Sequence, residues 1–283
     1  MKPVCMLLVL GLAVCSSSPA DGDETSAPLK VLFIGNSYTA VNDLPAIVES
    51  LAEAAGGRRI ETGRHLVGGA TLERHVKKTR AVDKIREKKW DVVVLQEQSL
   101  RPIIQRERMW QFARLLHAEI AKQDAETVFY LTWARQHITA MQAGSSEAEY
   151  QESMFTLSRS GESIEYETWC KQNEPGLREG LNGAYLGIAE ELKATVAPVG
   201  VAWQRALKAN TNRVLHHPDK SHPNRAGSYL AACVFYATLL RETPVGLPRR
   251  ARIGNKLLVD LSADEARMLQ TIAWDAVRQK LTD

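Results

Sequence analysis

The sequence predicts an α/β fold in which helices cover both faces of a mostly parallel, five-stranded sheet. The first observation is a regular alternation of short apolar runs with segments that have helical periodicity. The second is the third apolar run, residues 91–95, which is nearly all apolar and so is typical of a strand covered on both faces. The third is size, since 283 residues, 45% of them hydrophobic and 24% charged, allow one large domain with a sizeable core.

The first expected strand and helix set the pattern for the rest. Residues 31–34 are β-branched and aromatic, and a helix over residues 44–55 is expected to end at Gly56 and Gly57. The other expected strands are residues 60–67, 91–95, 127–131 and 196–199. Helices are expected at residues 74–89, 107–123, 182–195 and 226–240, with a further segment at 202–209, an apolar run at 256–261 and a terminal helix from Ser262.

The amino terminus has the pattern of a signal peptide over residues 1–20. Lys2 is followed by an apolar stretch and by a small-residue cleavage site at residues 18–20. The apolar stretch is too short to span a bilayer. The alternative is a lipoprotein signal in which Cys15 carries the lipid. Either signal predicts an exported protein, periplasmic or extracellular.

The rest of the chain is expected to form one domain, residues 29–283, after a flexible linker at residues 21–28. Residues 142–180 break the alternation and are expected to be an insertion on the ligand side of the sheet. Removal of the signal leaves two cysteines, Cys170 and Cys233, too few for a disulfide scaffold. A bridge between the two stays open at this point.

The charge balance argues against some classes of partner. The chain has 36 basic and 33 acidic residues, and a net charge of +3 is too weak to imply nucleic acid or an anionic membrane. The basic run within residues 74–89 has no interleaved aromatic residues that could stack on bases. It is therefore interpreted as the solvated face of a helix.

A candidate nucleophile follows the first strand. Ser37 comes two residues after Gly35, at the carboxyl end of a strand, where open α/β sheets bind their ligands. A base for it is available in a polar loop that carries Asp219 and His222. Their spacing allows the carboxylate to accept the Nδ1–H of the imidazole, which leaves Nε2 free to take the serine proton. The alternative is a surface loop whose polar residues only cap the next helix.

Donors for an oxyanion are expected near the same serine. The backbone N–H groups of Gly68 and Gly69 follow the second strand, the amide of Ser37 is a further donor, and Gln98 lies at the tip of the third strand. Asn36 is interpreted chiefly as holding the turn. A metal cluster of the loop histidines with Asp219 is a weaker alternative, because adjacent histidines point in different directions.

The order of these residues resembles the four blocks of the SGNH (GDSL-like) hydrolase family. The blocks are Gly35-Asn36-Ser37, then Gly68 or Gly69, then Leu95-Gln96-Glu97-Gln98-Ser99, and last Asp219-x-x-His222. The resemblance covers most of the expected domain and is closest to an exported bacterial branch whose first block is G-N-S. It implies a flavodoxin-like three-layer α/β/α sandwich and hydrolysis of esters, thioesters or O-acetyl groups without a metal or other cofactor. It also implies Ser37 as nucleophile, His222 as base and Asp219 as the orienting acid.

The third block departs from the family pattern L-G-x-N-D. Gln98 stands where the oxyanion asparagine is usual, and Gln96 is the competing candidate. A longer side chain can still donate if the backbone lies further back. If neither amide reaches, the loss of one donor costs on the order of 10²–10³ in kcat.

These features lead us to expect a serine esterase that acts on a small-molecule or glycan ester, with an O-acetylated saccharide as the leading substrate class. A lipid esterase or thioesterase is the second enzymatic possibility, and a catalytically weak carbohydrate-binding protein of the cell envelope is the third. The sequence contains no phosphate loop and none of the motifs G-x-G-x-x-G, H-E-x-x-H and G-x-S-x-G. No motif of this kind therefore indicates another chemistry. The oligomeric state stays open.

Overall fold

The computed structural model describes residues 27–135, 180–210 and 212–281. The expected signal peptide, Cys15, Cys170, most of the linker and almost all of the expected insertion fall outside these ranges, so those expectations stay predictions. Within the described ranges, no helix is both long and apolar enough to cross a bilayer.

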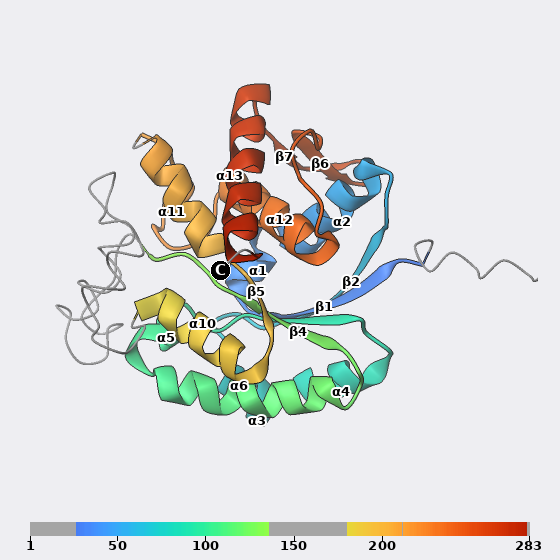
Figure 1. Ribbon diagram of the computed structural model, residues 1–283, viewed down its shortest axis with the longest axis vertical. Coiled ribbons are helices and arrows are strands. Elements are labelled where there is room, and N and C mark those ends of the chain that lie inside the picture. Colours follow the sequence, from blue (N-terminus) through green and yellow to red (C-terminus); the bar gives the residue numbers. More distant parts are fainter. Residues whose placement is uncertain (1–26, 136–179, 211, 282–283) are drawn as a thin grey trace, which may run out of the picture.

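Five parallel strands form the central sheet, as the sequence predicts, in the order β2-β1-β3-β4-β5 (Figure 1). They are β1 (Leu29–Gly35), β2 (Ile60–Leu66), β3 (Val92–Leu95), β4 (Glu126–Tyr130) and β5 (Thr195–Ala197). Every neighbouring pair is parallel. From β1 the chain goes to β2 at one edge of the sheet and then returns to form β3 on the other side of β1. The strand order therefore reverses at β1. In open α/β sheets this point holds the ligand site.

Helices cover both faces of this sheet, which gives the three layers (Figure 1). One layer contains α2 (Leu44–Ala55), α11 (Val199–Ala209), α12 (Arg225–Leu240) and α13 (Ala263–Leu281). The other contains α3 (Leu72–Lys78), α4 (Ala81–Glu87), α5 (Arg101–Ile104), α6 (Arg106–Ala121) and α10 (Gly180–Leu192). In β1, Val31 and Phe33 pack into the first layer, whereas Leu32 and Ile34 pack into the second. A strand that is covered by helices on both faces is expected to be apolar on both faces.

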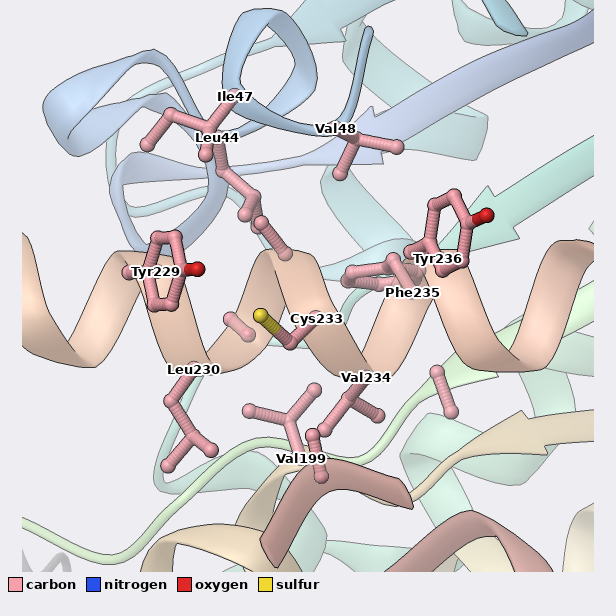
Figure 2. Close-up of a cluster of buried hydrophobic side chains, with 14 of the residues drawn as sticks. Leu44, Ile47, Val48, Val199, Tyr229, Leu230, Cys233, Val234, Phe235 and Tyr236 are labelled. Atoms are coloured by element: carbon pink, nitrogen blue, oxygen red, sulfur yellow. The ribbon is translucent and has the colours of Figure 1, made fainter. Parts of the chain in front are cut away.

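Helix α12 is the centre of the first layer. All residues from Ala226 to Ala237 are buried, because the helix lies between the sheet, α2 and α13. Figure 2 shows its side chains against Leu44, Ile47 and Val48 of α2 and against Val199. Cys233 is fully buried among them. Since Cys170 is not described, a bridge between these cysteines stays untested.

The single basic helix predicted for residues 74–89 is wrong. The segment forms two short helices, α3 and α4, that separate at Thr79, whose backbone is extended (φ −126°, ψ 179°). The Thr79 hydroxyl donates to the carbonyl of His75 (3.0 Å) and accepts from the N–H of Ala81 (3.3 Å). This side chain therefore bonds to both helices at the break, as threonine often does at helix ends.

Besides α5, three short elements were not expected from the sequence. Helix α1 (Ser37–Ala40) and the 3₁₀ turn Val41–Asp43 come between β1 and α2. The expected run at 256–261 forms β7 (Lys256–Asp260), which pairs antiparallel with β6 (Arg250–Ile253) in a separate hairpin. The alternating charges of β6 give no continuous apolar signal, although Ala251 and Val259 are buried.

Candidate active site

The chain turns sharply where β1 ends, and this nucleophile turn (residues 35–39) carries Ser37. Asn36 is buried and caps α1, since its Oδ1 accepts from the N–H of Tyr38 (3.1 Å). Its Nδ2 donates to the carbonyl of Ala70 (2.9 Å), on the loop after β2. Asn36 therefore holds the turn, as expected, and also fastens it to the neighbouring loop. Ser37 is the first residue of α1, where helix geometry leaves a backbone N–H without a partner.

Gln96 supports this turn from the end of β3. Its Oε1 accepts from the N–H of Asn36 (2.8 Å) and from the hydroxyl of Thr39 (3.0 Å), and its Nε2 donates to the carbonyl of Glu97. A Cβ atom on Gly35 would lie 2.7 Å from the same Oε1, so a larger residue there would force the Gln96 side chain out of this position. The Gln96 amide is thus engaged inside the protein, which argues against it as the oxyanion donor.

A buried histidine lies on the other side of the turn. Nε2 of His75 is 3.0 Å from the carbonyl oxygen of Gly35, and Nδ1 is 3.2 Å from the hydroxyl of Thr79. Burial lowers the pKa of His75 to about 4. The neutral imidazole therefore donates to Gly35 and stabilises the turn without adding charge.

The histidine loop (residues 216–224) meets the nucleophile turn. Nε2 of His222 is 2.8 Å from Oγ of Ser37, and Nδ1 of His222 is 2.6 Å from Oδ2 of Asp219. The structure therefore brings together all three residues that the sequence selected. They form the hydrogen-bonded chain that a nucleophile, a base and an orienting acid require.

Asp219 has a second set of bonds that keeps it charged. Its Oδ1 accepts from the N–H groups of Ser221 and His222, each at 2.9 Å. Partial burial raises the pKa of Asp219, but these two bonds and the His222 imidazole outweigh it and lower the pKa to about 2. The carboxylate is therefore ionised at neutral pH and orients the imidazole through Nδ1–H.

Aromatic residues that the sequence reasoning missed hold the loop in place. The hydroxyl groups of Tyr38 and Ser221 are 2.7 Å apart, and Trp133 Nε1 donates to the carbonyl of Ser221 (2.9 Å). The rings of Tyr38 and Trp133 stack at 4.8 Å, and Trp133 stacks on Trp203 at 4.1 Å. Tyr38 also packs edge-on against His222 (5.3 Å). The position of Tyr38 directly after Ser37 was the one signal in the sequence that could have identified this aromatic support.

The alternative roles of the loop are resolved by where its side chains lie. Asn224 does cap α12, because its Oδ1 accepts from the N–H of Gly227 (2.9 Å), so the loop has both functions. His216 is buried, and its Nε2 is 3.0 Å from the carbonyl oxygen of Ala134. Over the described ranges, no three potential ligands are grouped so as to hold a metal ion.

One of the segments that carry the expected oxyanion donors is bonded to the nucleophile turn. The loop with Gly68 and Gly69 is tied to the nucleophile turn by the Val67 N–H bond to Gly35 (3.0 Å). Gly69 has a φ of 62°, which favours glycine. Gln98 Oε1 accepts from the N–H groups of Leu100 (2.8 Å) and Arg101 (3.2 Å), and these donors identify that atom as oxygen. Nε2 of Gln98 makes no hydrogen bond within the described part of the chain, so this amide can still donate.

Solved structures with a similar fold include three informative examples. A candidate SGNH hydrolase from Slackia heliotrinireducens is 23% identical with a TM-score of 0.56, covering 75% of this chain and 99% of that one. A DUF4886 family protein from Bacteroides uniformis is 18% identical with a TM-score of 0.61, covering 89% and 96%. An acetyl xylan esterase is 15% identical with a TM-score of 0.52, covering 74% and 98%.

No protein-family model matches this sequence, and no curated protein matches it. At the identities found, structural similarity establishes the architecture. The chain therefore has the three-layer α/β/α fold of the SGNH hydrolases.

Proposed function

We propose that the chain is a serine esterase of the SGNH type, with Ser37 as nucleophile, His222 as general base and Asp219 as orienting acid. The observation that carries this proposal is the unbroken series of contacts from Ser37 Oγ through His222 to Asp219, at 2.8 and 2.6 Å. Both distances are short enough for direct proton transfer or strong hydrogen bonding.

The reaction is a double displacement. His222 Nε2 takes the proton of Ser37 as Oγ attacks the ester carbonyl, and the resulting imidazolium is stabilised by the Asp219 carboxylate. The same Nε2–H then protonates the departing alcohol, which leaves an acyl group on Ser37. Water, deprotonated by His222, attacks this acyl-enzyme and releases the acid.

Three donors are proposed for the tetrahedral oxyanion. They are the N–H of Ser37, the N–H of Gly68 or Gly69, and Nε2 of Gln98. The Gln98 Nε2 atom makes no hydrogen bond to any described residue, which supports its assignment over Gln96, whose amide is bonded to Asn36, Thr39 and Glu97. In this assignment the longer glutamine replaces the asparagine that the family pattern has.

A small acyl group on a polar substrate fits the surroundings best. Gly68 and Gly69 are exposed, and the Asp219 side chain is 42% exposed. The aromatic residues nearby are buried and support the loop, so they do not form an acyl-chain tunnel. An O-acetylated saccharide therefore remains the leading substrate class, and the acetyl xylan esterase of similar fold is consistent with it. An exported location, based on residues 1–20, is part of the proposal.

The first test is the hydrolysis of p-nitrophenyl esters of increasing chain length. We expect the acetate to react fastest, and Ser37→Ala to lower kcat by about 10⁴-fold or more while the fold is retained. Labelling with a fluorophosphonate probe should map to Ser37. Unchanged turnover in Ser37→Ala would exclude this mechanism.

The same assay separates the alternatives. A steady rise in rate with acyl length would favour the lipid esterase or thioesterase. No turnover in the wild-type protein, together with binding to an acetylated glycan, would favour the carbohydrate-binding protein.

A further inference from the structure

A buried carboxyl group lies between the two glutamines at the end of β3, and the triad does not use it. The Glu97 residue is only 1% exposed. Its Oε1 accepts from the N–H of Gln98 (2.6 Å) and of Leu72 (3.2 Å), and its Oε2 is 3.3 Å from the same Leu72 nitrogen. Within the described residues it forms no ion pair. A buried carboxyl without a cation is costly, so its presence here calls for an explanation.

The two N–H groups belong to the two elements that carry the proposed oxyanion donors. Leu72 begins α3, three residues after Gly69, while Gln98 carries the side-chain amide proposed as a donor. We propose that Glu97 is a positioning residue that, as a neutral acid, holds this glycine loop and Gln98 at the spacing that the oxyanion hole requires. This inference rests on the proposed esterase function.

Burial favours the neutral form of this carboxyl group, and the bonding pattern can accommodate its proton. Oε1 can accept both N–H groups as the carbonyl oxygen, which leaves Oε2 to carry the proton. Burial raises the pKa of Glu97 to about 8, although the Gln98 N–H, the charge of Arg101 and the Leu72 N–H lower it, and Glu73 raises it further. Arg101 is on α5 and Glu73 on α3.

The remaining facing group is on α10. The hydroxyl of Tyr185 accepts the backbone N–H of Glu97 (3.3 Å), and burial raises the pKa of this phenol, so it stays neutral. Loss of the Glu97 proton therefore places a buried negative charge, which Arg101 offsets only in part, next to the proposed oxyanion donors. That charge opposes the negative charge of the tetrahedral intermediate and slows turnover.

The decisive variant is Glu97→Gln, which keeps an acceptor oxygen and cannot ionise. For the wild-type enzyme, kcat for p-nitrophenyl acetate should fall about tenfold from pH 7 to pH 9, because about one tenth of an acid stays protonated one unit above its pKa. Glu97→Gln should match the wild type at pH 7 and show no such fall, with KM unchanged. Glu107→Gln on α6, whose side chain is 75% exposed, is the matched control and should follow the wild type.

A second variant, Glu97→Ala, removes both bonds and should lower kcat at every pH. The role of Glu97 is overturned if Glu97→Gln shows the same alkaline fall as the wild type, or if it loses activity at pH 7 while its circular dichroism is unchanged. Failure of the esterase function looks different. In that case the wild type neither turns over the ester nor reacts with fluorophosphonate at Ser37, and both proposals fall together.

Discussion

The nucleophile turn and the histidine loop supply the two halves of one site, but the protein holds them in different ways. In the turn, Asn36 and Gln96 are buried, and their polar groups bond to the backbone of neighbouring strand ends. In the loop, Asp219 is 42% exposed, and the anchors are a few contacts from Tyr38, Trp133 and Asn42. The turn that carries Ser37 is therefore part of the folded core, whereas the loop that carries His222 is attached to its surface. Substitutions in the turn should affect stability as well as activity, whereas substitution of the exposed Asp219 in the loop should affect activity far more than stability.

The largest effect that separates the two regions is expected for Asp219→Asn. An asparagine cannot stabilise the imidazolium and favours the wrong tautomer of His222, so kcat should fall by roughly 10⁴-fold. The free energy of unfolding at neutral pH should change little, because the side chain is partly exposed. Ester hydrolysis and urea denaturation measure the two quantities. A clear loss of stability with retained turnover would contradict the contrast drawn between the regions.

The paired variants Gln96→Leu and Gln98→Leu test the contrast within one strand end. Gln96→Leu leaves the N–H of Asn36 without an acceptor, so we expect the free energy of unfolding to fall by about 1–3 kcal/mol or more. Gln98→Leu should instead lower kcat on the order of 10²-fold with the smaller stability loss, through removal of an oxyanion donor. Full stability of Gln96→Leu, or full activity of Gln98→Leu, would contradict the role assigned to that residue.

A smaller effect is expected where the loop meets the turn, at the contact of Tyr38 with Ser221. Loss of one hydrogen bond is worth about 1 kcal/mol, so Tyr38→Phe and Ser221→Ala should each lower kcat by roughly fivefold. The double variant should be no worse than either single variant, because both remove the same bond. Effects that simply multiply would show that this bond does not position His222.

The sequence predicted the sheet well because its strands are covered on both faces and leave continuous apolar runs. It also selected the three residues of the hydrogen-bonded series, since Ser37 follows a strand and Asp219 precedes His222 at an informative spacing. The sequence could not decide whether Gln96 or Gln98 is the oxyanion donor, because the two residues differ in the hydrogen-bond partners of their side-chain amides. Gln96 meets Asn36, which is 60 residues away in the chain. Partners so distant in sequence leave no local pattern.

One error and one omission have the same physical origin. The break between α3 and α4 depends on Thr79, whose hydroxyl bonds to both helices, while the hydrophobic spacing continues across it. The burial of Glu97 depends on the cover supplied by α3 and α10. A glutamate between two glutamines has the composition of a surface loop, so the sequence alone placed no weight on it.

The close fit of Gly35 against Gln96 has a consequence for how this site can be re-engineered. Position 98 is the easier one to exchange, because its bonds to the N–H groups of Leu100 and Arg101 are only partly buried, so the asparagine of the family pattern can be tested there by a single substitution. Position 96 cannot be exchanged alone, because a smaller residue removes the acceptor of the Asn36 N–H, and any residue larger than glycine at position 35 collides with the glutamine. These two sites behave as a single unit, and a library that varies either one alone should return only the starting pair.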